Sequence, residues 1–417
     1  MGVPLQRAMK THSFLSGWIR SGCNVAALLA LAGLTAHAAI PVGDSNVQIG
    51  GFFSQGYLYN DENNFPTEDK GGTFDFREFA FNASTTIGAH LRVGAQVFAQ
   101  KLGNIGDDKV TLDWAVADYN FSPAFGVRLG RVKYPKGLYG ESLDLDVVRP
   151  FVFLPYSVYN PVLRDFASAV NGGSVYGSVN VGKSTFDYKL FYGNIPMNPS
   201  KGVAEFYNNF GAYSNAAGGV SQLVMDYAAG GQLVWNTPVS GLKFVYSYSY
   251  FSKLVTNGPF IAATSLNLYS HIPKFTWDTV SAEYAVRNWT FAAEWQRTGG
   301  TIDYATQPVP VVSVVSPVGW DAYYVSAARR INDKLEFGAY YSYLKTRYPG
   351  TTAHDTAGDH LADIAVSAHY EINEHISCKL EYHWFDGRYE TFNTPRIVNP
   401  APQDKSGLLA VKTTFSF

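Results

Sequence analysis

The chain has 417 residues, and its 32 Lys and Arg against 34 Asp and Glu give a formal net charge of −2 at pH 7. This balance excludes a general nucleic-acid binder, which would need an excess of basic residues. Beyond residue 40 no segment offers the roughly eighteen consecutive apolar residues that a membrane helix requires, although hydrophobic residues make up 46% of the chain. With 28 Tyr, 28 Phe and 39 Gly and no helical period, the composition favours many strands and turns.

Residues 1–38 predict a signal peptide that is cleaved after Ala38. No acidic residue occurs before Asp44, and the apolar run over residues 25–34 is too short to remain as a membrane helix. The run is followed by Ala36-His37-Ala38, a small-x-small pattern typical of a cleavage site. The positive charges before it come from Arg7, Lys10 and Arg20. Residues 39–417 then form a single exported domain, whose only cysteine, Cys378, excludes an internal disulfide.

Apolar and polar residues alternate through most of the remaining chain, as in strands that have one face in each environment. In residues 289–296 one face carries Trp289, Phe291 and Trp295, and the opposite face carries Glu294 and Gln296. A soluble β-sandwich would also alternate. Strands of about ten residues with aromatic side chains near their ends are instead typical of an outer-membrane barrel. The side chains predicted to face the interior are Arg92, Gln96, Glu294, Lys379, Glu381 and His383.

Short turns and long loops alternate along the chain, as expected for the two ends of an outer-membrane barrel. Long loops are predicted over residues 135–171, 254–271 and 300–316, among other places. The alternation predicts about sixteen strands, an even number that puts both termini on the periplasmic side. A barrel of about sixteen strands leaves an aqueous lumen, whereas one of about eight is filled by side chains. The predicted fold is therefore all-β, a transmembrane antiparallel β-barrel.

The longest connection, Pro135–Asn171, follows the fifth predicted strand and is expected to fold inward and narrow the lumen. Pro150, Pro155 and Pro161 exclude a regular hairpin, and the aromatic content of the connection argues against disorder. Folding inward would bury the aromatic side chains against the wall and aim the charges into the lumen. The alternative is an outer loop that packs on its neighbours or on another subunit. The predicted constriction residues are Arg128, Arg131, Lys133, Lys136, Glu141, Asp144, Asp146, Arg149 and Arg164.

The strand before this loop carries Arg128, Arg131 and Lys133, which cannot share one face at strict period two. A charge that faces lipid at mid-depth costs about 2–4 kcal/mol. We therefore predict a bulge at Gly130 that turns all three inward; the alternative is a basic face that meets another subunit. The basic groups of the set are expected to face its acidic groups across the lumen and to set a transverse field. The facing sets are Arg131, Lys133, Lys136 and Arg149 against Glu141, Asp144 and Asp146.

Three stretches carry a family resemblance: Leu129-Gly-Arg-Val-Lys-Tyr-Pro-Lys-Gly-Leu-Tyr139, Arg149-Pro-Phe and Leu154-Pro-Tyr-Ser-Val-Tyr159. They resemble the corresponding region of Gram-negative porins, in particular the group that includes phosphate-selective porins. The family's basic strand end is matched by Gly130, Arg131, Lys133 and Pro135, but no ladder of arginines matches, so phosphate selectivity is not implied. The resemblance implies a homotrimeric channel for small polar solutes, embedded in outer-membrane lipid. The terminal Phe417 is similar to the signal that the outer-membrane assembly machinery recognises.

Residues 177–184 match the nucleotide-binding pattern G-x-x-x-x-G-K-[ST], which requires a loop that leads into a helix N-terminus. Both flanks alternate as strands, so we interpret Gly182 and Lys183 as a hairpin turn. No G-x-S-x-G motif occurs, and a contact between His383 and Asp363 across adjacent strands would not make a catalytic triad. The spacing of the late histidines fits no closed zinc site. The sequence predicts no enzyme, no metal site and no cofactor.

The predicted function is passive diffusion of ions and small hydrophilic solutes through an outer-membrane porin. Within transport, the alternative is a solute-selective channel for anions, phosphate or sugars. A different class is a plugged barrel with a structural or adhesive role, which loops of this length permit.

Overall fold

The computed structural model describes residues 40–41, 46–103, 105–144, 146, 149–199, 202–209, 219–260, 265–310, 313–347, 357–389 and 402–417. The predicted signal peptide lies outside these residues. The described helices are α2 (Arg164–Ala167), α3 (Val203–Asn209) and the 3-10 turns η2 (Gly140–Ser142), η4 (Pro161–Leu163) and η5 (Ala357–Asp359). None of these helices is long and apolar enough to span a membrane.

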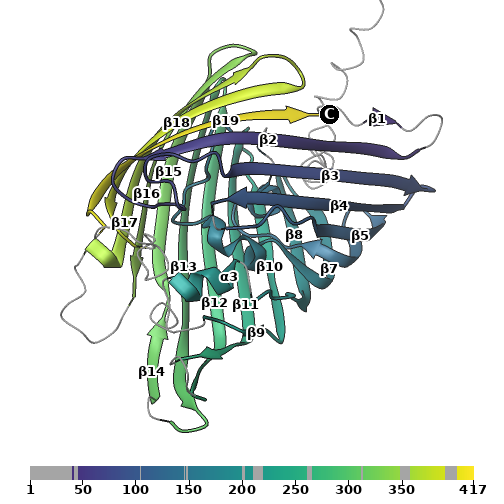
Figure 1. The fold of residues 1–417 in the computed structure, drawn as a ribbon. Helices are drawn as coiled ribbons and strands as arrows, with labels where there is room; N and C mark the ends of the chain where they lie inside the picture. The colour runs from purple at the N-terminus through teal and green to yellow at the C-terminus, as the bar shows by residue number, and fades with distance from the viewer. Residues whose placement is uncertain are drawn as a thin grey trace, which may run out of the picture.

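Sixteen long antiparallel strands form one closed barrel in the described part of the chain, which confirms the predicted fold class and strand number (Figure 1). Each long strand pairs with the next one, and β19 pairs with β2 to close the ring. The long strands are β2 (Gln48–Asn60), β3 (Phe76–Ile87), β4 (Leu91–Leu102), β5 (Thr111–Ser122), β6 (Phe125–Lys133), β7 (Ala169–Val181), β8 (Ser184–Asn194), β10 (Tyr227–Asn236), β11 (Leu242–Pro259), β12 (Asn267–Val286), β13 (Trp289–Gln307), β15 (Trp320–Arg330), β16 (Leu335–Thr346), β17 (His360–Glu371), β18 (Ile376–Gly387) and β19 (Lys405–Ser416). The short strands are β1 (Ile40–Pro41), β9 (Gln222–Val224) and β14 (Ser313–Val318).

The two faces of the wall differ sharply in polarity. On β13, Glu294 and Gln296 are 2% and 1% exposed, whereas Phe291 and Trp295 are 41% and 39% exposed. Polar side chains therefore face inward and apolar ones outward, as in a barrel that is surrounded by lipid and holds water. The predicted interior residues that are fully buried are Gln96, Glu294, Lys379, Glu381 and His383, and Arg92 is partly exposed.

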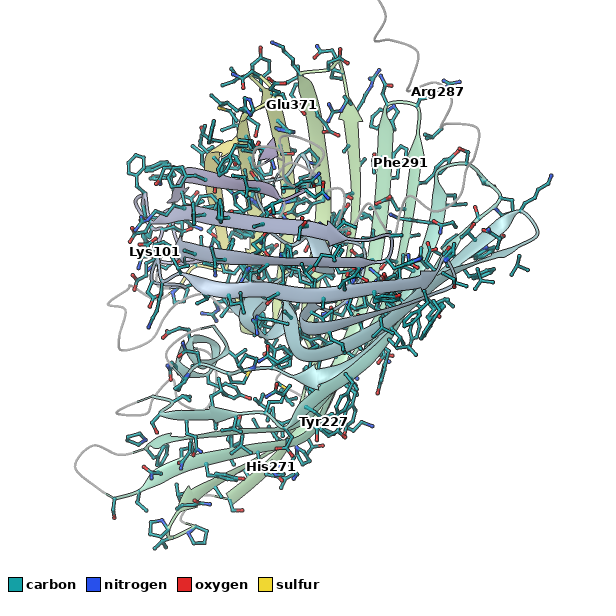
Figure 2. All side chains as sticks on the ribbon, turned by 90° about the vertical axis from the view of Figure 1, so that its right-hand side faces the viewer. Lys101, Tyr227, His271, Arg287, Phe291 and Glu371 are labelled. Carbon is teal, nitrogen blue, oxygen red and sulfur yellow. The ribbon has the colours of Figure 1, made fainter. Side chains whose placement is uncertain are left out.

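The two ends of the barrel differ in the length of their connections. Arg287 and Glu371 lie in or beside short turns at one end, and His271 lies at the opposite end (Figure 2). At the His271 end, β11, β12 and β13 reach 18, 20 and 19 residues. The loops predicted over residues 254–271 and 300–316 are therefore wrong in extent, because alternating residues there pair into hairpins that continue the strands.

The nucleotide-binding pattern falls in the hairpin between β7 and β8. Strand β7 ends at Val181 and β8 begins at Ser184, so Gly182 and Lys183 form the turn. Gly182 has a φ of +61°, a conformation that glycine adopts without strain. A strand follows the motif where phosphate binding would need a helix, and the interpretation as a hairpin turn is confirmed.

Candidate functional site

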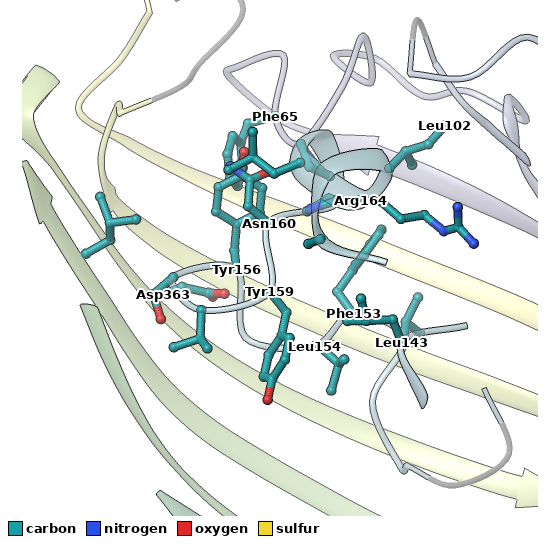
Figure 3. Close-up of a pocket in the computed structure, with 18 of the residues that line it drawn as sticks. Phe65, Leu102, Leu143, Phe153, Leu154, Tyr156, Tyr159, Asn160, Arg164 and Asp363 are labelled. Carbon is teal, nitrogen blue, oxygen red and sulfur yellow. The ribbon is translucent and has the colours of Figure 1, made fainter. Parts of the chain in front are cut away.

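The connection between β6 and β7, residues 134–168, is termed the strap. It bonds to inner-face groups of β6 and β8, of β11, β13 and β15, and of β18 and β19. Figure 3 shows strap residues Tyr156 and Tyr159 beside the wall, with Asp363 of β17 nearby. The strap also accepts a hydrogen bond from Gln232 of β10 through the carbonyl of Gly137, so it is tied to strands around much of the ring. Three of these attachments, centred on Glu294, Asp146 and Asp144, are described in turn.

The first attachment is Glu294 of β13, which is buried on the inner face. Its carboxylate accepts hydrogen bonds from the strap's Leu138 N–H at 3.1 Å and Tyr159 hydroxyl at 2.6 Å. From the wall it accepts the hydroxyls of Ser281 at 2.6 Å and Tyr324 at 2.7 Å. Hydrogen bonds to a charged group contribute about 1.5–3 kcal/mol each, so neutral donors suffice to hold this carboxylate and the strap together.

The second attachment centres on Asp146 of the strap. Its carboxylate lies 3.1 Å from the Lys379 ammonium of β18 and 3.2 Å from the Lys412 ammonium of β19. It also accepts the Thr414 hydroxyl at 2.8 Å. All four residues are buried. Two cations therefore share one acid; Lys412 also pairs with Glu78 of β3 at 2.6 Å, so Lys379 depends on Asp146 more than Lys412 does.

Glu381 of β18 strengthens the second attachment through the strap backbone. Its carboxylate accepts the Val152 and Phe153 N–H groups, both at 2.9 Å. The Nε2 atom of His383 lies 3.0 Å from the same carboxylate, and its Nδ1 atom lies 3.0 Å from Asp363. The contact expected between His383 and Asp363 is thus present. Within the described residues, no group of three His, Cys, Asp or Glu side chains is arranged to hold a metal ion.

The third attachment is a charge network beside β5 and β6. Asp144 of the strap lies 2.7 Å from both Lys133 and Arg164. Asp113 of β5 pairs with the same two cations, at 3.1 Å from Lys133 and 3.0 Å from Arg164. Gln96 donates to Asp113 at 2.9 Å. Two acids and two bases thus neutralise one another where the strap leaves the wall.

A neighbouring pair extends this network toward β8. Glu141 of the strap contacts the Lys189 ammonium, and Arg128 of β6 lies 3.7 Å from the other carboxylate oxygen. Arg128 also pairs with Asp118 of β5 at 2.7 Å.

The strap's acids remain ionised despite their burial. Burial alone would raise the pKa of Glu141, Asp144 and Asp146. The ammonium and guanidinium groups beside each carboxyl outweigh that effect and hold its pKa below the ordinary value. Each acid therefore stays charged, and bonded to its basic partners, at neutral pH.

The predicted bulge at Gly130 is wrong. Strand β6 pairs with both β5 and β7 across Gly130 without a register shift. The irregularity lies between β4 and β5, where Gln96 pairs with residue 114 and Val97 with residue 112. Asp113 is the extra residue of this bulge and is only 2% exposed. The bulge in β5 therefore points Asp113 inward, where it pairs with Lys133 of β6. No bulge in β6 itself is involved.

The predicted constriction residues form close pairs within three groups. The groups are Lys133, Asp144 and Arg164; Arg128 and Glu141; and Arg149 and Asp146. The other two bond to carbonyl oxygens, Arg131 to that of Asp113 at 2.8 Å and Lys136 to that of Val158 at 2.6 Å. Most of these acidic and basic side chains therefore contact one another directly, whereas the sequence analysis expected them to face each other across the lumen.

Lys136 lies beside two aromatic rings, whereas Arg128 and Arg164 each lie over one. Its ammonium lies 4.1 Å from the ring centroid of Trp277 and 5.3 Å from that of Tyr159. Burial lowers the pKa of Lys136 to about 7, although nearby Glu294 acts in the opposite direction. This lysine therefore changes charge near neutral pH.

The aromatic side chains of the strap are buried against the wall. Phe153 stacks on Phe76 of β3 with ring centroids 5.2 Å apart, and Tyr156 meets Phe65 edge-on at 4.6 Å. These contacts belong to an apolar cluster that also includes Leu408 of β19. Apolar packing and the polar attachments together fix the strap's position.

Several residues of the site were not singled out by the sequence. Lys412, Lys189 and Asp118 lie on polar faces of their strands, so the period-two pattern could have identified them as interior residues. Asp113 could not be found in this way, because its position depends on the bulge. Tyr159 carries no charge, and its bond to Glu294 depends on the path of the strap.

Comparison with known proteins places the fold. No protein-family model and no curated protein sequence matches the chain. OmpT of Vibrio cholerae superimposes with a TM-score of 0.56 at 11% identity, over 91% of this chain and 100% of that one. OmpF of Salmonella typhi, in a complex with daunomycin, gives 0.54 at 14% identity, over 91% and 100%. The anion-selective porin from Comamonas acidovorans gives 0.52 at 12% identity, over 89% and 99%.

These likenesses define a class: the chain has the fold of the bacterial outer-membrane porins. At such low identities the likeness extends to the fold and not to the solute.

Proposed function

We propose that the protein is a porin of the bacterial outer membrane, through which ions and small hydrophilic solutes diffuse passively. The observation that carries this proposal is a polar inner face with a strap bonded to it at three separate places. A barrel of about sixteen strands is too wide for its wall side chains to fill. A segment fixed against the inner face then sets the width and charge of the aqueous path.

In the charge network beside β5 and β6, the relative exposure of the paired charges favours anions over cations, whereas in the neighbouring pair Glu141 is more exposed than Arg128, at 15% against 6%. The side chains of Lys133 and Arg164 are 13% and 12% exposed, whereas those of Asp113 and Asp144 are 1% and 5% exposed. A passing ion therefore meets the basic partners more closely than the acidic ones. We propose a modest anion preference, because the buried acids still cancel most of the field at longer range.

A barrel closed by its own strap is the second candidate. It is favoured by the extent of apolar packing around the strap, which joins aromatic residues of the strap to several strands. Such a barrel would have a structural or adhesive role, and its outer connections would carry the function.

The deciding experiment is reconstitution of the folded protein in a planar bilayer, with single-channel recording under a salt gradient. Stable open steps with a reversal potential on the anion side are expected. Silence from protein whose fold has been verified would overturn the channel proposal and favour the closed barrel. Open steps with a cation preference would keep the channel and overturn the proposed sign.

Several expectations accompany this proposal and stay predictions. They are export by a cleaved signal peptide over residues 1–38, assembly as a homotrimer in outer-membrane lipid, and recognition of Phe417 by the assembly machinery. The absence of enzymatic activity and of any cofactor is likewise a prediction. Steps that occur in groups of three in the same recordings would support the trimer.

A further inference from the structure

A cavity of about 90 Å³ lies between the strap and the inner wall, bordered by residues of β3, β4, β12, β13 and β15 to β19 (Figure 3). On the same measure a single water needs about 10–15 Å³, so the cavity has room for a small solute rather than one water. Aromatic rings form much of its lining, including Tyr156 and Tyr159 of the strap.

Four buried polar atoms of residues that line this cavity have no hydrogen-bond partner in the described part of the chain. They are Arg149 Nε, Trp277 Nε1, Gln296 Oε1 and Trp320 Nε1. Their residues are 8%, 2%, 1% and 8% exposed, in that order. Buried polar atoms almost always have a partner, and a buried indole N–H usually finds one. Their placement around one space indicates a ligand that both accepts and donates hydrogen bonds.

Three of these groups are held close together by the register of the wall. Trp277 of β12 pairs with Thr298 of β13, and the Trp320 N–H of the backbone donates to the Thr298 hydroxyl at 2.9 Å. Gln296 lies two residues before Thr298 on the same face of β13. The two indoles and the amide therefore present two N–H donors and one amide group from three adjacent strands.

The charge of the lining argues against an ionic ligand. The lining carries four lysine and arginine side chains against three acidic ones, so the charges nearly cancel; they are Lys101, Lys136, Arg149 and Arg164, and Glu78, Asp144 and Asp363. A neutral ligand avoids the desolvation that a bare charge would suffer in such a site. Hydroxyl groups satisfy indole donors as acceptors, and they satisfy an amide in either of its orientations.

We propose that this cavity is a binding site for a neutral, polyhydroxylated ring of about monosaccharide size. The aromatic rings would cover the apolar faces of such a ring, while its hydroxyls bond to Trp277, Gln296 and Trp320. This proposal deepens the proposed channel function, on which it rests, by assigning a solute class to the path beside the strap.

The test uses glucose as the probe and the full-length folded protein. In planar bilayers, glucose is expected to reduce ion current in a saturable manner. Saturation-transfer NMR of glucose with the protein in detergent gives an independent binding curve. Trp320→Phe and Gln296→Met each remove one hydrogen bond and should raise the half-saturating glucose concentration roughly two- to tenfold. Trp295→Phe, at an outward position that is 39% exposed, is the matched control and should leave it unchanged.

The outcomes separate this proposal from the proposed function. An open channel whose current responds to glucose without saturation, or equally in all variants, overturns the binding site and leaves the porin. A folded protein that does not conduct overturns the porin, and the NMR titration then still decides the site. Tighter binding of the charged analogue glucuronate than of glucose would overturn the neutral class.

Discussion

The strap is held at two parts of the wall by different chemistry. On β13, one carboxylate, Glu294, gathers neutral hydroxyl and amide donors. On β18 and β19, Asp146 is clamped between the ammonium groups of Lys379 and Lys412. If the Glu294 carboxylate is neutralised, its neutral donors can keep most of their hydrogen bonds to it. If one partner of a buried ion pair is neutralised, the other partner is left as an unpaired charge in a low-dielectric interior.

The largest effect is expected from Asp146→Asn. The substitution leaves the buried Lys379 without its acid, while Lys412 keeps Glu78 at 2.6 Å. Removing one partner of a buried pair costs about 3–5 kcal/mol. Urea unfolding of the folded protein should show a loss of this size. Asp386→Asn is the matched control, because Asp386 pairs with Lys405 at 3.7 Å on the exposed surface, where such pairs contribute little. Equal losses in the two variants would contradict the assigned role of Asp146.

A smaller effect is expected from Glu294→Gln, which keeps the shape and removes the charge. An amide still accepts from some of the four donors, so the loss in the free energy of unfolding should be about 1.5–3 kcal/mol. The strap should also loosen on this side and increase the noise of the open-channel current. Asp278→Asn removes a carboxylate that accepts a tyrosine hydroxyl at the exposed surface and serves as control. A loss as large as that of Asp146→Asn would show that both attachments depend on charge.

The smallest effect concerns pH and Lys136. Burial lowers its pKa to about 7 from an ordinary value of 10.5, so the lysine gains its proton as pH falls through 7. The anion preference of the channel should therefore rise between pH 8 and pH 6, and Lys136→Met should abolish most of that rise. Lys183→Met, in the exposed β7–β8 turn, is the control. An unchanged pH response in Lys136→Met would remove Lys136 as its source.

The lowered pKa of Lys136 also makes the free energy of unfolding depend on pH. The folded-state pKa lies below that of the unfolded chain, so the unfolded lysine binds its proton more readily. The contribution of Lys136 to the free energy of unfolding should accordingly increase as pH rises from about 7 toward 10.5, and level off below 7. Urea unfolding of the protein and of Lys136→Met across that range measures the difference.

More of the barrel wall than of the strap could be predicted from the sequence. Alternation identified the buried faces around Gln96, Glu294 and Lys379, because a strand's side-chain period of two is local and fixed by backbone geometry. The extents of β11 to β13 were misjudged, since alternating residues can pair beyond the barrel as well as within it. The bulge was assigned to Gly130 when it lies at Asp113, because register irregularities depend on the neighbouring strand.

The sequence by itself determined that the chain forms many membrane-type strands, which side chains face inward, and that a long aromatic and charged connection follows the fifth strand. These features follow from composition and short-range periodicity. Only the tertiary structure decided which acid pairs with which base, and that Glu294 and Asp146 hold the strap at separate parts of the wall. It also decided that Trp277, Gln296 and Trp320 line one cavity. Such contacts join residues far apart in the chain, and the path of the strap, which no local pattern encodes, brings them together.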